Sequence, residues 1–167
     1  MKTNHRTQSG DPPEASLSPV ISDSPEATED IAAIISSVAR PGDIFALEGT
    51  LSAGKTAFAR GFARGLGIGE AVTSPSFPII QEYDGTPPLF HMDLYRLGDS
   101  DEVIETGAQE LWFGSGISLI EWPDRASDIL PEHCIYLHFE IIGDTRRQIG
   151  IRGAAHRIEE IKRAIGR

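Results

Sequence analysis

Residues 49–56 combine glycines, a lysine and a threonine at a spacing suited to binding phosphate. Gly49 is followed by four residues and then by Gly54, Lys55 and Thr56, which is the P-loop pattern. A loop that runs directly into a helix N-terminus directs backbone N–H groups and a partial positive charge at one point. Lys55 would add a full charge for the β- and γ-phosphates, and the Thr56 hydroxyl can be a ligand of the Mg2+ that bridges them. We therefore expect ATP and Mg2+ as ligands, with nucleotide contacts from Gly49, Leu51, Ser52, Ala53, Gly54, Lys55, Thr56 and Ala57.

Two carboxylates stand at the ends of predicted strands. Asp93 follows the apolar residues 89–92, and Glu121 follows residues 117–120. An acidic residue at a strand end is where a P-loop protein holds magnesium or its bound water. For Asp93 a helix or turn cap is the ordinary alternative. Physical chemistry alone does not rank the two carboxylates.

The elements that position these residues predict an α/β fold. Residues 44–47 are apolar without alternation, as expected for a strand buried on both faces. The helix after the loop places Phe58, Phe62 and Leu66 on one face. Ser24 and Pro25 are a suitable start for an earlier helix that ends before Pro41. Further strands are expected within 71–85 and over 89–93, 117–120, 134–142 and 148–152, with helical segments over 99–112 and 155–165.

Together these elements predict a single P-loop NTPase-like domain with a central, mainly parallel sheet flanked by helices and a C-terminal β-hairpin. The chain has 167 residues, enough for one sizeable core. Residues 1–20 carry several prolines among polar residues and few large apolar side chains, so we expect a disordered tail. The domain is then expected over residues 21–167.

Composition restricts the partners of the chain. The net charge of −10 argues against broad electrostatic binding to nucleic acid or to an anionic membrane. Any nucleic-acid role is therefore expected to be indirect. A single cysteine cannot form an intrachain disulfide, and neither a secretory signal nor an apolar span of about 20 residues is present. We expect a cytoplasmic protein.

Several further motifs accompany the P-loop in a fixed order. They are Val72-Thr-Ser-Pro-Ser-Phe77, Glu82-Tyr83, Phe90-His-Met-Asp-Leu-Tyr-Arg-Leu97 and Leu119-Ile-Glu-Trp-Pro123. With these motifs the chain resembles the TsaE (YjeE) family over about residues 24–140. Members of that family are bacterial ATPases needed for the threonylcarbamoyladenosine (t6A) modification of tRNA. The resemblance implies binding of ATP and Mg2+ and action with the TsaB and TsaD proteins, so that tRNA is reached only through that complex. ATP hydrolysis is then expected to reset the complex, and to be slow in the isolated protein.

The resemblance also assigns roles near the phosphates. Lys55 and Thr56 hold phosphate and magnesium, and Thr73 belongs to a loop that faces the γ-phosphate. Glu121 is placed at the metal. Asp93 is placed nearer to the γ-phosphate and the attacking water. The implied catalytic residues are thus Asp93, Thr73 and Lys55, and the implied metal ligands are Thr56 and Glu121.

Two further residues are implied to lie near the nucleotide. Trp122 is similar to an aromatic residue of the family beside the nucleotide, although packing is its ordinary role. Thr28 matches a threonine of the first helix near the adenine side, although an exposed helix position is what its pattern alone favours.

The sequence departs from the family pattern at four positions. Thr50 stands where an acidic residue is usual, Ser52 where glycine is usual, and Ser76 and Pro78 replace threonines. If position 52 requires a positive φ, serine costs about 1 kcal/mol relative to glycine. Weaker nucleotide binding is the expected consequence.

Two other functions fit a P-loop. A small-molecule kinase needs an acceptor pocket and a cationic lid, and no arginine-rich segment occurs between residues 67 and 121. A non-enzymatic switch, in which ATP only orders a docking surface, fits the acidic charge and the lack of an obvious general base. Phosphate transfer to a small acceptor distinguishes the first function. The second function predicts that the complex forms equally with ATP and with a non-hydrolysable analogue, and that tRNA is fully modified with both.

Overall fold

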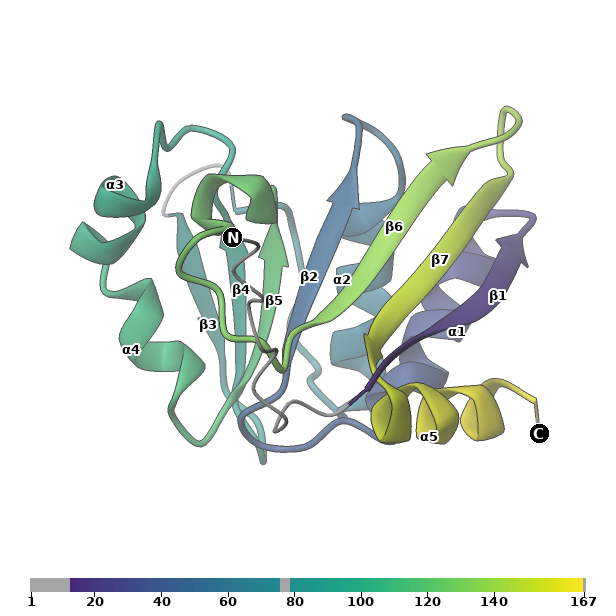
Figure 1. Ribbon diagram of the computed structural model, residues 1–167. Coiled ribbons are helices and arrows are strands. Elements are labelled where there is room, and N and C mark those ends of the chain that lie inside the picture. The colour runs from purple at the N-terminus through teal and green to yellow at the C-terminus, as the bar shows by residue number, and fades with distance from the viewer. Residues whose placement is uncertain (1–12, 76–78, 167) are drawn as a thin grey trace, which may run out of the picture.

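The computed structural model describes residues 13–75 and 79–166 as one α/β domain built on a seven-stranded sheet (Figure 1). The strand order is β1-β7-β6-β2-β5-β4-β3. The strands are β1 Glu14–Ser22, β2 Ile44–Gly49, β3 Ile80–Tyr83, β4 Leu89–Asp93, β5 Ile117–Glu121, β6 Ile135–Ile141 and β7 Arg147–Ala154. The helices are α1 Pro25–Ser36, α2 Lys55–Gly65, α3 Ser100–Glu105, α4 Ala108–Trp112, the short 3-10 helix η1 Pro123–Ala126, and α5 Ala155–Ile165.

The sheet is mixed, so the prediction of a mainly parallel sheet is wrong outside its centre. Strands β6, β2, β5 and β4 pair in parallel. The outer pairs β1–β7, β7–β6 and β4–β3 are antiparallel. Antiparallel edge strands on a parallel centre are common in large α/β sheets. The parallel centre brings the carboxyl ends of β2, β4 and β5 to the same edge, where open α/β sheets bind ligands.

The N-terminal segment forms an edge strand, so the prediction of a disordered tail over residues 1–20 is wrong for residues 14–20. β1 pairs antiparallel with β7, and the register shifts between Leu17 and Val20, on either side of Pro19. Proline has no N–H to donate to the ladder, so within a sheet it is tolerated at an edge irregularity of this kind, where that bond is not needed. Residues 1–12 lie outside the described part of the chain. The domain therefore begins before residue 21.

Helices α1 and α2 pack closely against each other on one face of the sheet (Figure 1). Ser24 caps α1, because its side-chain oxygen accepts a hydrogen bond from the N–H of Ala27 at 3.1 Å. A Cβ at Gly61 would lie 2.0 Å from the carbonyl oxygen of Glu29, so only glycine allows this approach. Across the contact, Arg60 pairs with Glu29 at 3.0 Å. Ile34 of α1 is 38% exposed.

Apolar side chains bury both faces of the sheet. Phe45 and Leu47 of β2 join one cluster with residues of α1, α2 and α5, including Phe58 and Phe62. Ile44 joins a second cluster with residues of α3, α4 and η1. This explains why β2 lacks alternation, since a strand buried on both faces needs apolar residues throughout. In the described part of the chain, no helix combines the length and apolar character needed to cross a membrane.

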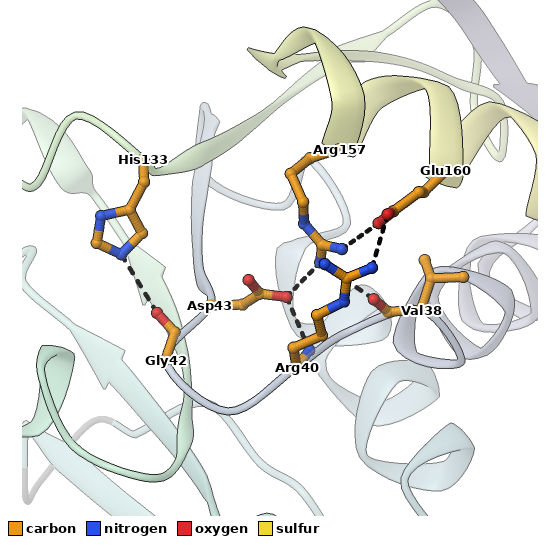
Figure 2. Close-up of polar contacts among 7 residues, drawn as sticks. All are labelled: Val38, Arg40, Gly42, Asp43, His133, Arg157 and Glu160. Carbon is orange, nitrogen blue, oxygen red and sulfur yellow. Dashed lines mark hydrogen bonds and ion pairs between the residues drawn. The ribbon is translucent and has the colours of Figure 1, made fainter. Parts of the chain in front are cut away.

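A polar network fixes α5 to the amino end of β2 (Figure 2). The buried guanidinium of Arg157 donates hydrogen bonds to Asp43, to Glu160 and to the carbonyl of Val38 at 3.0 Å. The backbone N–H of Arg40 also donates to Asp43, at 2.8 Å. Because Asp43 directly precedes β2, this network lies at the end of the strand opposite to Gly49. It anchors the last helix at the edge of the sheet opposite to the loop between β2 and α2.

Candidate nucleotide-binding site

The loop between β2 and α2 adopts a glycine-dependent conformation. Gly49 and Gly54 have φ values of 150° and 108°. A Cβ at Gly49 would lie 2.9 Å from the carbonyl oxygen of Phe139 on β6. Ser52 has a φ of 64°, so position 52 does require a positive φ. Serine therefore costs about 1 kcal/mol there relative to glycine. The N–H of Ala53 donates to the carbonyl of Thr50 at 3.1 Å and closes the turn.

Lys55 is the first residue of α2, and its side chain is buried under the loop. Its ammonium donates to the carbonyl oxygens of Gly49 at 2.5 Å and of Thr50 at 3.4 Å. It also lies 4.1 Å from the ring centroid of Trp122. Burial lowers the pKa of Lys55, because desolvation disfavours the charged form, while the negative charge of Glu121 opposes that change. The loop carbonyl oxygens and the Trp122 ring thus hold the ammonium in place at the start of α2.

Asp93 and Glu121 lie side by side at the edge where the strands end. They occupy paired register positions on the parallel strands β4 and β5. Asp93 Oδ1 accepts a hydrogen bond from the N–H of Tyr95 at 3.0 Å. Burial raises the pKa of Asp93, and the charge of Glu121 acts in the same direction. Glu121 is buried and lies 2.8 Å from Nε2 of His91.

Trp122 follows Glu121 in the left-handed region, with a φ of 57°. A bulky side chain at a positive φ persists only when its surroundings hold it. The Tyr95 ring packs against Trp122 with a centroid distance of 4.8 Å, and Pro123 begins η1 directly after it. The indole is thereby fixed beside the ammonium of Lys55.

A cavity of about 230 Å³ joins these elements. Most of the residues assigned to the site from the sequence line it: Leu51, Ser52, Ala53, Gly54, Lys55, Thr56, Ala57, Asp93, Glu121 and Trp122. Gly49 instead lines a neighbouring cavity of about 580 Å³ that also includes Trp122. Among the described residues, Thr28 and Thr73 are not part of the 230 Å³ lining. Ser76 and Pro78 lie outside the described part of the chain.

Thr28 has a local structural role in α1. Its hydroxyl lies 2.7 Å from the hydroxyl of Ser22 and 3.3 Å from the carbonyl of Ser24. It is buried, so the exposed position that its pattern favours is wrong. Its contacts join the end of β1 to the first turn of α1.

Several residues of the site were not predicted from the sequence. Arg60, Ser74 and Tyr95 also line the cavity. Arg60 lies four residues after Thr56, which puts the two on one helix face, so helical spacing offered a signal for it. Ser74 and Tyr95 are close neighbours of Thr73 and Asp93 in sequence. Arg147 contacts the loop from β7, and no local pattern points to it.

Oxygen donors suited to Mg2+ lie together in this cavity. Magnesium is usually held by one or two carboxylates together with phosphate oxygens and water. The hydroxyl of Thr56 and the carboxylates of Glu121 and Asp93 fit that requirement. Over residues 13–75 and 79–166, no cluster of three or more His, Cys, Asp or Glu side chains forms a complete metal cage. The donor set therefore fits a metal that is bound jointly with phosphate.

Comparison with known proteins decides the family. A family model described as "Threonylcarbamoyl adenosine biosynthesis protein TsaE" matches residues 22–149, which is most of the chain. The chain belongs to the TsaE family. The resemblance inferred from the sequence motifs is therefore confirmed. The matched range includes the loop, both strand-end carboxylates and Arg147.

Relatives in the TsaE family are similar over most of their length. The protein named tRNA threonylcarbamoyladenosine biosynthesis protein TsaE from Bacillus subtilis (strain 168) is 42% identical over 144 residues, covering 86% of this chain and 90% of that protein. The protein of the same name from Treponema pallidum (strain Nichols) is 38% identical over 118 residues, covering 71% and 87%. The crystal structure of Bacillus subtilis YdiB matches with a TM-score of 0.75 and 35% identity, over 95% of this chain and 97% of that one. The α/β domain is thus shared with a solved structure.

Proposed function

We propose that this chain binds and hydrolyses Mg2+–ATP as a component of t6A modification of tRNA in the bacterial cytoplasm, acting with TsaB and TsaD. One observation carries the proposal. The buried ammonium of Lys55 and the paired carboxylates of Asp93 and Glu121 line the same cavity as the turn between β2 and α2. The TsaE relatives, named for threonylcarbamoyladenosine biosynthesis, support the pathway.

Each residue has a role that follows from its position. The N-terminus of α2 and the ammonium of Lys55 attract the phosphates. The Thr56 hydroxyl and the Glu121 carboxylate would hold Mg2+, which neutralises charge on the phosphate oxygens when bound. Asp93, at the neighbouring strand end, would orient the attacking water. The raised pKa of Asp93 fits a group that handles a proton, because a catalytic base works best when its pKa approaches the working pH.

Slow turnover is expected from the isolated protein. Arg60 lines the cavity, but its guanidinium pairs with Glu29 at 3.0 Å. A cation or positioning group that is absent from a P-loop site lowers the rate by about 10³–10⁵-fold. We therefore expect the TsaB–TsaD complex to complete the site and accelerate hydrolysis.

The test is ATP turnover of the purified protein, alone and with purified TsaB and TsaD. We expect acceleration by the complex, and loss of both ATP binding and turnover in Lys55→Ala. Lys162→Ala, at an exposed lysine of α5, is the matched control and should behave as the unmodified protein. Turnover by Lys55→Ala equal to that of the control would disprove the site.

The same assay separates the other two functions. Full tRNA modification with a non-hydrolysable ATP analogue would show that ATP acts only as a docking switch. Transfer of the γ-phosphate to a small acceptor would show a kinase. Release of inorganic phosphate, together with a requirement for hydrolysis in repeated rounds of modification, supports the proposal.

A further inference from the structure

Arg147 joins the β6–β7 turn to the loop between β2 and α2. It is the first residue of β7 and is half-buried. Its guanidinium donates to the carbonyl oxygens of Ala53 at 3.1 Å and of Ser52 at 3.2 Å. On its other side it donates to the carbonyls of Gly143 at 3.1 Å and of Arg146 at 2.9 Å. One side chain thus bridges two loops that are far apart in sequence.

These contacts set the direction of the loop peptides. In a trans peptide the carbonyl and the following N–H point to opposite sides. Because the carbonyl of Ala53 points to Arg147, the N–H of Gly54 in the same peptide points away from Arg147. The carbonyl of Ser52 points to Arg147 in the same way. Arg147 is not among the residues that line the 230 Å³ cavity, so it holds these two carbonyl oxygens, which would repel a phosphate, on its own side of the loop.

The contacts also support the strained residue of the loop. Ser52 has a φ of 64°, a conformation that a residue with a side chain rarely adopts. Such a residue persists only when the surrounding structure holds it. The two carbonyls held by Arg147 are that of Ser52 itself and that of the next residue. The guanidinium is well suited to fix both, because it donates from two nitrogens, Nε to Ala53 and Nη2 to Ser52, that are held in a rigid planar geometry.

We propose that Arg147 is a positioning residue that holds the phosphate-binding loop open to the nucleotide and compensates for serine at position 52. This inference deepens the proposed function and rests on nucleotide binding by the same cavity. Arg147 acts through the backbone of the loop. It does not need to touch the nucleotide.

The first test compares Arg147→Ala and Arg147→Lys with Arg146→Ala in ATP titrations. Arg146 is the adjacent residue and pairs with Asp23 at 2.8 Å, so its removal takes the same charge from the same turn and leaves the loop intact. We expect both Arg147 variants to bind ATP about tenfold more weakly, because each loses charge-assisted hydrogen bonds to the loop. Arg146→Ala should stay within about twofold of the unmodified protein on the same reasoning. Equal weakening by Arg146→Ala would mean that only overall charge matters, and would overturn the inference.

The second test asks whether glycine at position 52 replaces the support. Glycine takes a positive φ without penalty. Ser52→Gly combined with Arg147→Ala should therefore recover much of the ATP affinity that Arg147→Ala alone loses. A merely structural role for Arg147 elsewhere in the fold would not respond to a change at position 52. An identical loss of affinity with and without Ser52→Gly would contradict the compensation.

The third test needs no nucleotide, so it separates this inference from the proposed function. Hydrogen exchange of backbone amides is measured over residues 50–56 in the free protein. We expect faster exchange in Arg147→Ala and Arg147→Lys than in Arg146→Ala, with unchanged exchange in the central strands. Equal exchange in all three variants overturns the role of Arg147. If the unmodified protein binds no ATP, the proposed function fails, while the exchange result still decides whether Arg147 orders the loop.

Discussion

His91 and Glu121 form a buried pair between the adjacent parallel strands β4 and β5, with His91 Nε2 2.8 Å from Glu121 Oε1. The carboxylate of Glu121 accepts this hydrogen bond when the imidazole carries its proton on Nε2. Within the described residues, the other ring nitrogen of His91 is buried without a hydrogen-bond partner. The pair therefore fixes which way Glu121 presents its carboxylate at the strand end.

Loss of this pair should weaken magnesium-dependent ATP binding. In His91→Leu, Glu121 loses its orienting donor, and changes to such supporting residues typically lower metal affinity about 10- to 100-fold. His91→Gln keeps a donor and should lose less. His156→Ala, at an exposed position of α5, is the control. ATP affinity is measured across magnesium concentrations, and an unchanged magnesium dependence in His91→Leu would contradict the expectation.

The two strand-end carboxylates should give different defects. Glu121→Gln removes a charge from the proposed metal site and should weaken magnesium-dependent ATP binding. Asp93→Asn should leave binding largely intact and lower turnover, because a group that acts in the transition state affects rate more than affinity. Magnesium-dependent binding and single-turnover hydrolysis are measured for both variants. The opposite pattern would mean that the two roles are exchanged.

Trp122 should report nucleotide binding through its fluorescence. Its ring lies 4.1 Å from the Lys55 ammonium, which is expected to move towards phosphate when ATP binds. The second tryptophan, Trp112, is buried and donates to the sulfur of Met92 at 3.4 Å. The titration is therefore done in Trp112→Phe. Constant emission on ATP addition in that background would indicate that Trp122 only packs.

Arg157 should stabilise the fold without affecting the site. Arg157→Met leaves the partly buried carboxylate of Asp43 without its charged partner, with only the backbone N–H of Arg40 as a donor, and breaking a buried pair in this way destabilises by about 3–5 kcal/mol. Adding Asp43→Asn should restore part of that loss. Arg163→Ala, which breaks an exposed pair with Glu159, should change stability little. Denaturant unfolding measures all four proteins. Equal midpoints for Arg157→Met and Arg163→Ala would contradict this expectation.

Cys134 should be unreactive in the folded protein. Burial raises the pKa of its thiol to about 12, and only the thiolate attacks thiol reagents. Modification at pH 8 should require unfolding by denaturant. Above the ordinary pKa of 9.0, the unfolded chain releases this proton and the folded chain keeps it, so stability should fall as pH rises from 9.0 to about 12. Cys134→Ala should lack this part of the decline, and a parallel decline in both proteins would contradict it.

The sequence alone determined where the glycine-dependent loop lies, between a buried strand and a helix at one edge of the sheet. The spacing of Gly49, Gly54, Lys55 and Thr56 is local, and consecutive residues in a turn and a helix start have few alternative geometries. Asp93 and Glu121 were predictable as neighbours for a similar reason, because parallel strands bring their carboxyl ends to the same edge. The motifs around them were specific enough to indicate the TsaE family.

Only the tertiary structure decided which distant groups support that chemistry. The pairing of β1 with β7, the contact of Arg147 with Ala53, and the contact of His91 with Glu121 each join residues far apart in the chain. Thr28 was assigned to the nucleotide by resemblance, and its buried contacts with Ser22 and Ser24 became visible only in the fold. Hydrophobic patterns specify that a surface is buried, but they do not specify what covers it. Contacts between residues far apart in the chain depend on how whole helices and strands pack against one another. The packing in turn depends on residues throughout the chain.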